Sequence, residues 1–410
     1  MTSISTDVLV VGAGPAGSAA AAWAARAGRE VLLVDAATFP RDKTCGDGLT
    51  PRAIAQLQQL GMATWLETRP RNQGIRMLGF GARHELVWNG PHLPTFGSAA
   101  PRMELDAAIR DVALASGARA IDGFTAVAAE RDASGRVTAV RFKTSEGDRE
   151  IRCNALIVAD GVRSPLGRTL GRTWHRDTVF GVAARAYVQS ELHDDPWITS
   201  HLELRAQDGA AIPGYGWIFP LADGRVNIGV GSLSTKKRAA SVNLHDLLAQ
   251  YTEAQRVEWR LVGELHSVAS AMLPMGGAVS HVAGPNWMLV GDAAACVNPL
   301  NGEGIDYGLE TGHMAAMLLD ESDFTLAWPD ALRTAYADTF SIARRLGALL
   351  TYDWFLPRFG PIGMRSEAIM SIALRVMGNL VTDADHDWMA RQWRSAGTLS
   401  RRMDARAPWS

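Results

Sequence analysis

Short apolar runs that end in glycine or aspartate mark the first part of the chain. Residues 7–17 (DVLVVGAGPAG) predict a buried strand followed by a glycine-rich turn, and residues 18–27 predict an alanine-rich helix that ends at Gly28. Residues 30–35 (EVLLVD) predict a second strand, apolar throughout, of the kind that lies inside a parallel sheet. Together these segments form a βαβ unit.

The pattern then changes twice. Residues 51–60 and 103–115 have helical spacing, and residues 119–158 contain strand-like stretches separated by turn signals, which predict a small antiparallel ribbon. Between residues 176 and 235, alternating and aromatic residues predict a sheet-rich insert. After residue 303 the pattern is mainly helical to the end.

The strand-then-turn pattern of the N-terminus returns at residues 287–295 (WMLVGDAAA). A sheet that resumes so late in the chain implies a discontinuous domain, with the sheet-rich insert covering its site. We predict an α/β fold, α+β overall, with these parts: a Rossmann-like nucleotide-binding domain (1–75, 101–175 and 270–330), a sheet-rich substrate-binding domain (76–100 and 176–269) and a helical C-terminal region (331–410).

Composition argues against several classes of protein. The net charge of −2 gives no reason to expect a nucleic-acid partner. Cys45, Cys153 and Cys296 lie far apart without a CxxC pair, so we expect no disulfide framework, no zinc site and a reducing cytosol. The histidines show no metal-ligand spacing. The uncharged run 8–25 follows Asp7 and is broken by glycines, which argues against a membrane span or a signal peptide.

The first glycine turn fits a dinucleotide. Its G-x-G-x-x-G spacing is formed by Gly12, Gly14 and Gly17. The first glycine permits a tight turn, the second lets a pyrophosphate approach the backbone, and the third lets helix and strand pack closely. Pro15 and Ala16 lie at the helix N-terminus, where free N–H groups and the helix dipole attract phosphate. Asp35 closes the second strand, where a carboxylate can accept a hydrogen bond from a ribose hydroxyl.

Two further predicted strands end in a carboxylate beside a glycine. Asp160–Gly161 ends the first of these strands, and Gly291–Asp292 ends the second. A carboxylate followed by small residues suits a ribityl or ribose hydroxyl that comes close to the backbone. Each motif by itself is equally compatible with a simple turn.

In this order the three motifs resemble those of the FAD-dependent aromatic hydroxylase superfamily, in which they build one FAD site. The resemblance implies noncovalent FAD rather than NAD, with Arg102 matching an arginine that contacts the cofactor. It also implies that the helix after Pro299 points its N-terminus, with Gly302, Gly304 and Ile305, at the flavin pyrimidine. The dipole of that helix would stabilise the negative charge of reduced flavin.

Two segments narrow the resemblance. FPRDKTCGDGLTPRA (39–53) and PGYGWIFP (213–220) resemble the signatures of the geranylgeranyl reductase family, the second matching its PxYxWxFP box. The resemblance covers nearly the whole chain and is closest to actinobacterial members that saturate one isoprene unit of the menaquinone tail. It implies an FAD-dependent oxidoreductase that acts on CH–CH bonds and takes a polyprenyl quinone as substrate.

The family resemblance suggests roles for residues in both segments. Tyr215 and Trp217 are two apart, so on a strand they face the same side and can form an aromatic wall beside the tail; core packing is the alternative. Cys45 and Gly46 lie in a loop that the resemblance places near the flavin. The Cys45 thiol assists proton delivery, shapes the pocket, or is inert. Arg41 either meets phosphate or ribose of the cofactor, or is a solvated loop cation.

Three other functions stay open. They are a reductase of geranylgeranyl lipids or diphosphate, a flavin monooxygenase acting on an aromatic substrate, and a non-catalytic prenyl carrier. Because the chain has a single G-x-G-x-x-G, we expect no second nicotinamide domain and a transiently docking electron donor. NADPH, a ferredoxin-type protein and another reductase are all compatible with the sequence.

A polyprenyl substrate has to be collected from a membrane, since each CH₂ removed from water is worth about 0.8 kcal/mol. Residues 331–410 carry eleven Arg, no Lys and seven Asp or Glu. Their nine aromatics include Trp354, Trp388, Trp393 and Trp409. This composition predicts peripheral contact of a cytoplasmic protein with the inner face of the cell membrane. The alternative is that the aromatics pack on the FAD domain and the arginines are solvated.

Overall fold

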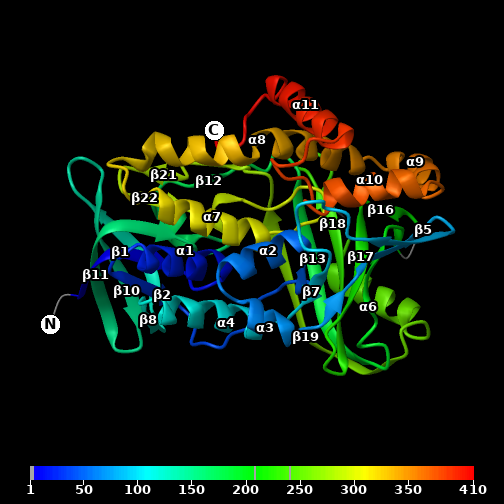
Figure 1. Ribbon diagram of the computed structural model, residues 1–410, viewed down its shortest axis with the longest axis horizontal. Coiled ribbons are helices and arrows are strands. Elements are labelled where there is room, and N and C mark those ends of the chain that lie inside the picture. Colours follow the sequence, from blue (N-terminus) through cyan, green and yellow to red (C-terminus); the bar gives the residue numbers. More distant parts are fainter. Residues whose placement is uncertain (1–3, 207–208, 240–241) are drawn as a thin grey trace.

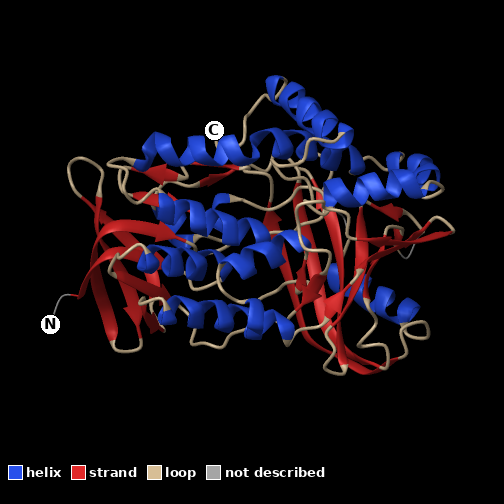
Figure 2. Cartoon of the chain, viewed as in Figure 1, coloured by secondary structure: helices blue, strands red, loops and turns tan. Residues whose placement is uncertain are grey.

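Two large sheets stand at opposite ends of an elongated molecule, with helices between and above them (Figure 1). The computed structural model of the chain describes residues 4–206, 209–239 and 242–410. Figure 2 shows the division: most strands belong to one of the two ends, and the longest helices run from one end toward the other.

The first sheet contains the predicted βαβ unit. Its strands are, in spatial order, β21 (Ala283–Gly284), β22 (Trp287–Leu289), β11 (Gly147–Val158), β1 (Ile4–Val11), β2 (Val31–Asp35) and β8 (Arg119–Asp122). All neighbours are parallel except β21 and β22. β9 (Thr125–Arg131) and β10 (Val137–Thr144) extend the sheet through antiparallel pairing with the first part of β11. The predicted ribbon at 119–158 was therefore wrong for β8, which pairs in parallel with β2.

Three helices pack together against this sheet. α1 (Pro15–Arg26) lies between α4 (Arg102–Ala115) and α7 (Ile305–Met317). Two glycines let α1 come close to its neighbours. A Cβ on Gly17 of α1 would lie 1.8 Å from the carbonyl oxygen of Gly12, in the turn after β1, and a Cβ on Gly312 of α7 would lie 2.3 Å from the carbonyl oxygen of Ala16 on α1. The third glycine of the motif therefore serves packing, as its position in the motif predicts.

The second sheet is mainly antiparallel and has seven strands. They are, in order, β19 (Leu261–Pro274), β13 (Phe180–Ser190), β18 (Arg225–Ser234), β17 (Gly214–Pro220), β14 (Trp197–His201), β5 (Gly74–Gly79) and β6 (Ala82–Val87). One face packs on α6 (Leu244–Gln255) through a core that includes Ile218, Ile228 and Leu248. The chain enters this sheet at residue 74 and again at residue 180, so neither large sheet comes from one continuous segment.

The C-terminal segment is helical, as predicted, and lies over both ends (Figure 1). Its helices are α8 (Phe324–Leu350), α9 (Phe355–Gly363), α10 (Glu367–Met377) and α11 (Trp388–Arg402). α11 packs on α8, and α10 packs on β6. Among the described residues no helix has the length and apolar character needed to cross a membrane.

Short elements connect these layers. They are α2 (Pro51–Gln59), α3 (Ala63–Glu67), α5 (Pro165–Thr169), a 3₁₀ turn (Gly291–Ala294) and three small sheets: β3 (Gly48–Leu49), β7 (Gly97–Ala99) and β4 (Arg71–Asn72); β12 (Thr173–Trp174) and β20 (Val279–Ser280); β15 (Leu204–Arg205) and β16 (Ala211–Ile212). α2 and α4 coincide closely with the helices predicted at 51–60 and 103–115.

Candidate active site

A cavity of about 1320 Å³ lies between the two halves of the molecule. Its walls come from the glycine turn after β1, the loop at 43–50, the face of β17 that carries Tyr215 and Trp217, the loop at 297–305 and helices α9 and α10. This volume exceeds the roughly 300–1,000 Å³ of a site for one small ligand. The cavity therefore has room for a dinucleotide together with part of a long apolar substrate.

The glycine-turn end of the cavity is lined by charged side chains. Gly14 caps the N-terminus of α1 without a side chain, so the first N–H groups of the helix stay open. A Cβ on Gly14 would lie 3.4 Å from an Arg41 Nη and 3.9 Å from an Arg102 Nη. Both arginines donate to the buried Asp106, at 2.9 Å from Arg41 and 2.6 Å from the Arg102 Nε. Two guanidinium groups therefore meet at one buried carboxylate beside the helix N-terminus.

Asp35 holds the glycine turn in place. One carboxylate oxygen accepts a hydrogen bond from the Ala13 N–H at 2.7 Å, and the other accepts from the Ala37 N–H at 2.8 Å. Arg41 comes within 4.0 Å of the same carboxylate. Asp35 therefore links the end of β2 to the turn and to the charged end of the cavity.

The other two carboxylate motifs also lie at the cavity. One Asp160 oxygen accepts from the Leu166 N–H at 2.8 Å and so caps α5, while its second oxygen is buried without a partner among the described residues. Burial raises the pKa of Asp160 above its ordinary value. Asp292 accepts from Lys43 at 3.3 Å. Gly161 and Gly291 both have positive φ, which suits glycine.

A second helix N-terminus opens into the same space. α7 begins at Ile305, and Gly304 caps it without a side chain. Gly302 has a φ of 77° and lines the cavity. Two open helix N-termini, two guanidinium groups and the carboxylates of Asp160 and Asp292 in one cavity are what a phosphate-bearing, hydroxyl-rich dinucleotide requires.

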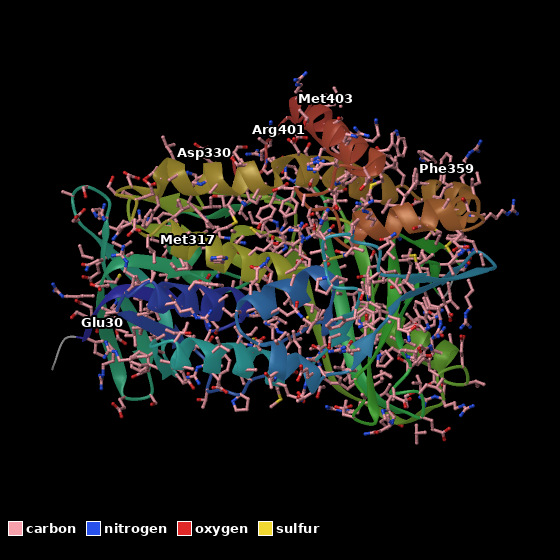
Figure 3. All side chains as sticks on the ribbon, in the orientation of Figure 1. Glu30, Met317, Asp330, Phe359, Arg401 and Met403 are labelled. Carbon is pink, nitrogen blue, oxygen red and sulfur yellow. The ribbon has the colours of Figure 1, made fainter. Side chains whose placement is uncertain are left out.

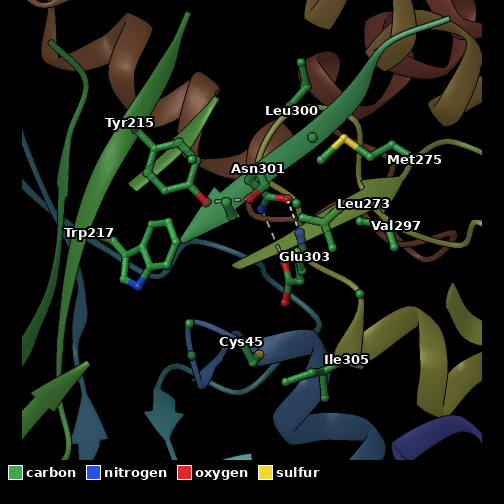
Figure 4. A pocket seen from close by; sticks show the side chains of 18 of the residues that line it. Cys45, Tyr215, Trp217, Leu273, Met275, Val297, Leu300, Asn301, Glu303 and Ile305 are labelled. Carbon is green, nitrogen blue, oxygen red and sulfur yellow. Dashed lines mark hydrogen bonds between the residues drawn. The ribbon is translucent and has the colours of Figure 1, made fainter. Parts of the chain in front are cut away.

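The opposite wall is aromatic. Tyr215 and Trp217 project from the same face of β17, with ring centroids 5.9 Å apart (Figure 4). The Tyr215 hydroxyl donates to the Asn301 carbonyl at 2.5 Å, and the Trp217 Nε1 donates to the Asn227 Oδ1 at 2.9 Å. A Cβ on Gly229 would lie 2.0 Å from the Trp217 ring, so glycine there makes room for the indole.

The Cys-Gly-Asp-Gly loop is tied to this wall by a residue that the sequence reasoning missed. Asp47, fully buried, accepts from the Tyr187 hydroxyl at 2.6 Å and the Asn227 Nδ2 at 2.9 Å. Asn227 also donates to the Cys45 carbonyl at 2.9 Å. Burial, despite these hydrogen bonds, raises the pKa of Asp47 to about 6. The only sequence signal for Asp47 was its place in the loop, since its partners lie on β13 and β18.

Cys45 lies at the cavity, below Tyr215 and Trp217 in Figure 4. Its Sγ accepts a hydrogen bond from the Asp47 N–H at 3.3 Å. Burial raises the pKa of its thiol, and the nearby Arg102 works against that rise. Gly46 leaves room for the wall, because a Cβ there would lie 3.3 Å from the Trp217 ring. Cys153 and Cys296 are buried free thiols outside the cavity.

The cavity continues from the aromatic wall into an apolar branch between the second sheet and the C-terminal helices. Its lining includes Ile75, Met77, Phe80, Ile198, Leu356, Met364, Met370 and Leu374. Several of these side chains form one hydrophobic cluster that joins β5 to α10. A long hydrocarbon chain fits such a lining because burial of apolar surface is favourable and requires no directed polar contact.

The described part of the chain contains no group of three or more His, Cys, Asp or Glu side chains arranged to hold a metal ion.

The comparisons with known proteins agree with the geometry. A protein family described as an FAD-binding domain matches residues 5–345. The chain is 61% identical to menaquinone reductase of Mycobacterium tuberculosis over 406 residues, which cover 99% of both chains.

This chain belongs to the geranylgeranyl reductase family. Digeranylgeranylglycerophospholipid reductase 1 of Methanopyrus kandleri is 31% identical over 360 residues, covering 84% of this chain and 90% of the relative. The crystal structure of a geranylgeranyl bacteriochlorophyll reductase-like protein from Thermoplasma acidophilum shares the fold, with a TM-score of 0.78, 19% identity and coverage of 96% and 100%. As a member of this family, the chain is a flavoprotein that uses FAD.

Proposed function

We propose that this family member is an FAD-dependent reductase that saturates one isoprene unit of the menaquinone tail. The observation that carries the proposal is a single cavity in which a dinucleotide cradle meets an aromatic wall and an apolar branch. Identity of 61% to a menaquinone reductase over the whole chain supports this substrate over other polyprenyl compounds.

In this proposal the charged end of the cavity holds the cofactor. The backbone at Gly12, Gly14 and Gly17 and the N-terminus of α1 at Pro15–Ala16 face the pyrophosphate, where Arg41 and Arg102 add positive charge. Asp35 accepts from the adenosine ribose, and Asp160–Gly161 and Gly291–Asp292 meet ribityl and phosphate groups. The cofactor-side residues Gly302, Gly304 and Ile305, at the N-terminus of α7, stabilise negative charge on the flavin ring.

The remaining catalysis comes from placement of the substrate. Reduced FAD supplies a hydride when it is bound. An isolated alkene has no carbonyl to polarise, so the protein must hold the correct double bond against the reacting face. Tyr215 and Trp217 form the wall that orients the tail, and their polar atoms are already hydrogen-bonded to protein. Cys45 and Gly46 shape the loop between wall and cofactor. The apolar branch holds the rest of the tail and keeps water away.

The test is reduction of the substrate by the chemically reduced protein, without a physiological electron donor. The protein is reduced chemically under anaerobic conditions and mixed with menaquinone or with a geranylgeranyl lipid. We expect menaquinone to gain the mass of two hydrogens while the flavin is reoxidised. Reduction of the geranylgeranyl lipid alone would move the substrate assignment to that lipid. A hydroxylated product formed with oxygen and an aromatic substrate would favour a monooxygenase, and protein without a flavin spectrum would favour a prenyl carrier.

We also propose that the electron donor is anionic, with NADPH as the first candidate. Arg163, Arg168 and Arg176 line the cavity, are exposed, and make no ion pair with described residues. Three unpaired cations at an opening attract a negatively charged ligand. Stopped-flow reduction of the flavin by NADPH should slow when Arg163 and Arg168 are changed to Gln. Equal rates of flavin reduction in the variant and the wild-type protein would show that Arg163 and Arg168 do not take part in donor binding.

We propose further that peripheral membrane contact occurs through α9 and the segment before it. Trp354, Phe359 and Ile362 are 54%, 42% and 57% exposed, and Figure 3 shows Phe359 on the outer side of α9. On the inner side Leu356 and Gly360 line the apolar branch. α9 therefore separates the cavity from an exposed apolar surface by the thickness of one helix, and a bilayer on that surface could deliver the tail directly.

The proposed membrane-contact surface is smaller than the one expected from the composition of residues 331–410. The expectation was wrong for Trp409, which is buried and donates to the Ala294 carbonyl at 2.7 Å. Arg375 is also excluded, because it pairs with Asp387. Arg358 and Arg365, beside the exposed apolar residues, make no ion pair within the described part of the chain. These two cations suit anionic headgroups.

Flotation with anionic liposomes tests the membrane proposal. Phe359→Ser together with Ile362→Ser should weaken binding, and Arg358→Gln with Arg365→Gln should weaken it most at low salt. Val257→Ser is the matched control, since Val257 is an apolar residue that is 89% exposed after α6. Equal binding by the α9 variants and the control would leave α9 as a solvent-exposed helix.

A further inference from the structure

Glu303 is an acidic residue that neither the FAD motifs nor the aromatic wall explains. It lines the cavity in the loop just before α7. Figure 4 shows its carboxyl group in the space bounded by Trp217, Cys45 and Ile305, which is where the cofactor end of the cavity meets the aromatic wall. A carboxyl group in this place faces whatever is bound between them.

The two carboxyl oxygens of Glu303 have different surroundings. One oxygen accepts a hydrogen bond from the Thr50 hydroxyl. The nearest donor to the other oxygen is the Asn301 amide, at 3.5 Å, which is too long for a strong hydrogen bond. The backbone on both sides is anchored, because the Glu303 N–H donates to the Asn301 Oδ1 at 2.9 Å and the Glu303 carbonyl accepts from the Asn298 N–H at 2.8 Å. The second oxygen is therefore held in place and is free to carry a proton.

Charge around Glu303 favours the protonated form. Two more carboxyl groups, Asp306 and Glu310, follow on α7. Arg52 on α2 brings a positive charge to this acidic group and pairs with Glu310 at 2.7 Å. Asp306 is buried and accepts from the Asn379 amide at 2.6 Å. Three carboxyl groups with one cation cannot all ionise at low cost when they lie out of water. Removal from water, and after it the neighbouring Asp306, raises the pKa of Glu303 well above its ordinary value.

Tyr215 and Cys45, which bear protons at the same part of the cavity, are weaker acids than a carboxyl group. Burial raises the pKa of Tyr215, and its hydroxyl proton is already donated to Asn301. Burial also raises the pKa of the Cys45 thiol, whose ordinary value lies far above that of a carboxyl group. A general acid works best when its pKa lies near the working pH, which favours a carboxyl with a raised pKa over a thiol or a phenol.

We propose that Glu303 is the catalytic acid that delivers the proton in alkene reduction. The inference rests on the proposed function. The C=C π bond breaks, one carbon takes the hydride from the reduced cofactor, and the other takes the proton from the Glu303 carboxyl, whose O–H bond breaks. Two C–H bonds form, the cofactor is left oxidised by two electrons, and Glu303 is left as a carboxylate. The carboxylate regains its proton from water after the product leaves.

Glu303→Gln tests the proposal, because the amide keeps the size of the side chain but is not an acid. Under anaerobic single-turnover conditions we expect flavin content and chemical reduction of the flavin to stay normal. Reoxidation of the flavin by menaquinone should slow by about 10²-fold or more, the usual contribution of a general acid. Glu303→Asp should recover part of the rate. Glu310→Gln is the control, since Glu310 belongs to the same acidic group but does not line the cavity.

Infrared spectroscopy supplies a readout that does not depend on turnover. The C=O band of a protonated carboxylic acid should be present near neutral pH in the wild-type protein and absent in Glu303→Gln. The wild-type single-turnover rate should fall as pH rises through the titration of Glu303. The rate of Glu303→Gln should not show this fall. The groups that face Glu303 and shape this titration are Arg52, Asp306, Tyr307 and Tyr215.

The outcomes separate this inference from the proposed function. A wild-type protein that reduces no polyprenyl compound overturns the proposed function and, with it, the role of Glu303. A wild-type protein that reduces menaquinone, while Glu303→Gln does so at the same rate, overturns only the inference. Loss of rate in Glu310→Gln equal to that in Glu303→Gln would also overturn it, because the effect would then belong to the acidic group as a whole.

Discussion

The two sides of the cavity are built in different ways. The cofactor side consists of backbone N–H groups, glycines and charges, within short stretches such as residues 12–17 and 302–305. The substrate side consists of apolar and aromatic side chains from β5, β17, α9 and α10, which lie far apart in the chain. Phosphate recognition depends on directed hydrogen bonds and tolerates little change, whereas hydrocarbon burial is non-directional. We therefore expect substitutions on the cofactor side to abolish binding and those on the substrate side to reduce rates gradually.

The largest effect is expected at Gly14. Gly14→Val places a branched side chain within reach of Arg41 and Arg102, in the space that the pyrophosphate needs. The purified variant should be colourless, and its flavin absorbance reports the loss. Gly28→Ala is the control: it sits at the far end of α1 with a φ of 82° and no neighbour within 4 Å of its Cβ, so it should lose some stability but keep its flavin. Full flavin occupancy in Gly14→Val would contradict the assignment of this turn.

The second effect concerns the loop that joins the two sides. Asp47 titrates near pH 6 in the folded protein against an ordinary value of 3.8, so the folded state binds its proton more tightly. Stability is therefore fully present at low pH and falls as pH rises from about 4 through 6, by roughly 3 kcal/mol from this group. Asp47→Asn should flatten that part of the profile of unfolding free energy. An unchanged slope in the variant would mean that another group causes it.

The third effect is on turnover alone. Trp217→Phe leaves the Asn227 Oδ1 without its indole donor, and Tyr215→Phe removes the hydrogen bond to the Asn301 carbonyl. Each variant should keep its flavin and lose about tenfold or more in kcat/KM, equal to roughly 1.4 kcal/mol of transition-state stabilisation. Cys45→Ala should behave in the same way. Full activity in any one of them assigns that side chain to packing.

The smallest effect is expected in the apolar branch. Met77→Leu changes the shape of a buried side chain but keeps its approximate volume. Such swaps usually cost less than about 1.5 kcal/mol in stability. The KM for menaquinone should change by less than about threefold, since the branch makes no directed contact with the tail. A much larger change would show that this part of the cavity recognises a specific shape, and the contrast between the two sides would be weaker than proposed.

The motifs could be predicted from the sequence because each one depends on residues that are close together in the chain. A strand, a glycine turn and a helix N-terminus lie within residues 7–17, so spacing alone predicted them, and the pair Tyr215 and Trp217 followed from alternation along one strand. α10 and α11 were expected only as part of a helical region, since apolar spacing does not say which face a helix covers. The buried position of Trp409 could not be inferred for the same reason: tryptophan suits a membrane interface and a protein core equally well.

By itself the sequence determined the βαβ unit and the family, and it located the glycine turn, the two carboxylate motifs and the aromatic box, because each depends on residues close together in the chain. Only the tertiary structure singled out two further carboxyl groups, Asp47 and Glu303. Asp47 meets Tyr187 and Asn227, and Glu303 meets Thr50, across sequence separations that no motif encodes. Whether a carboxyl is ionised depends on the water removed and the charges gathered around it, and both arise only when the chain has folded.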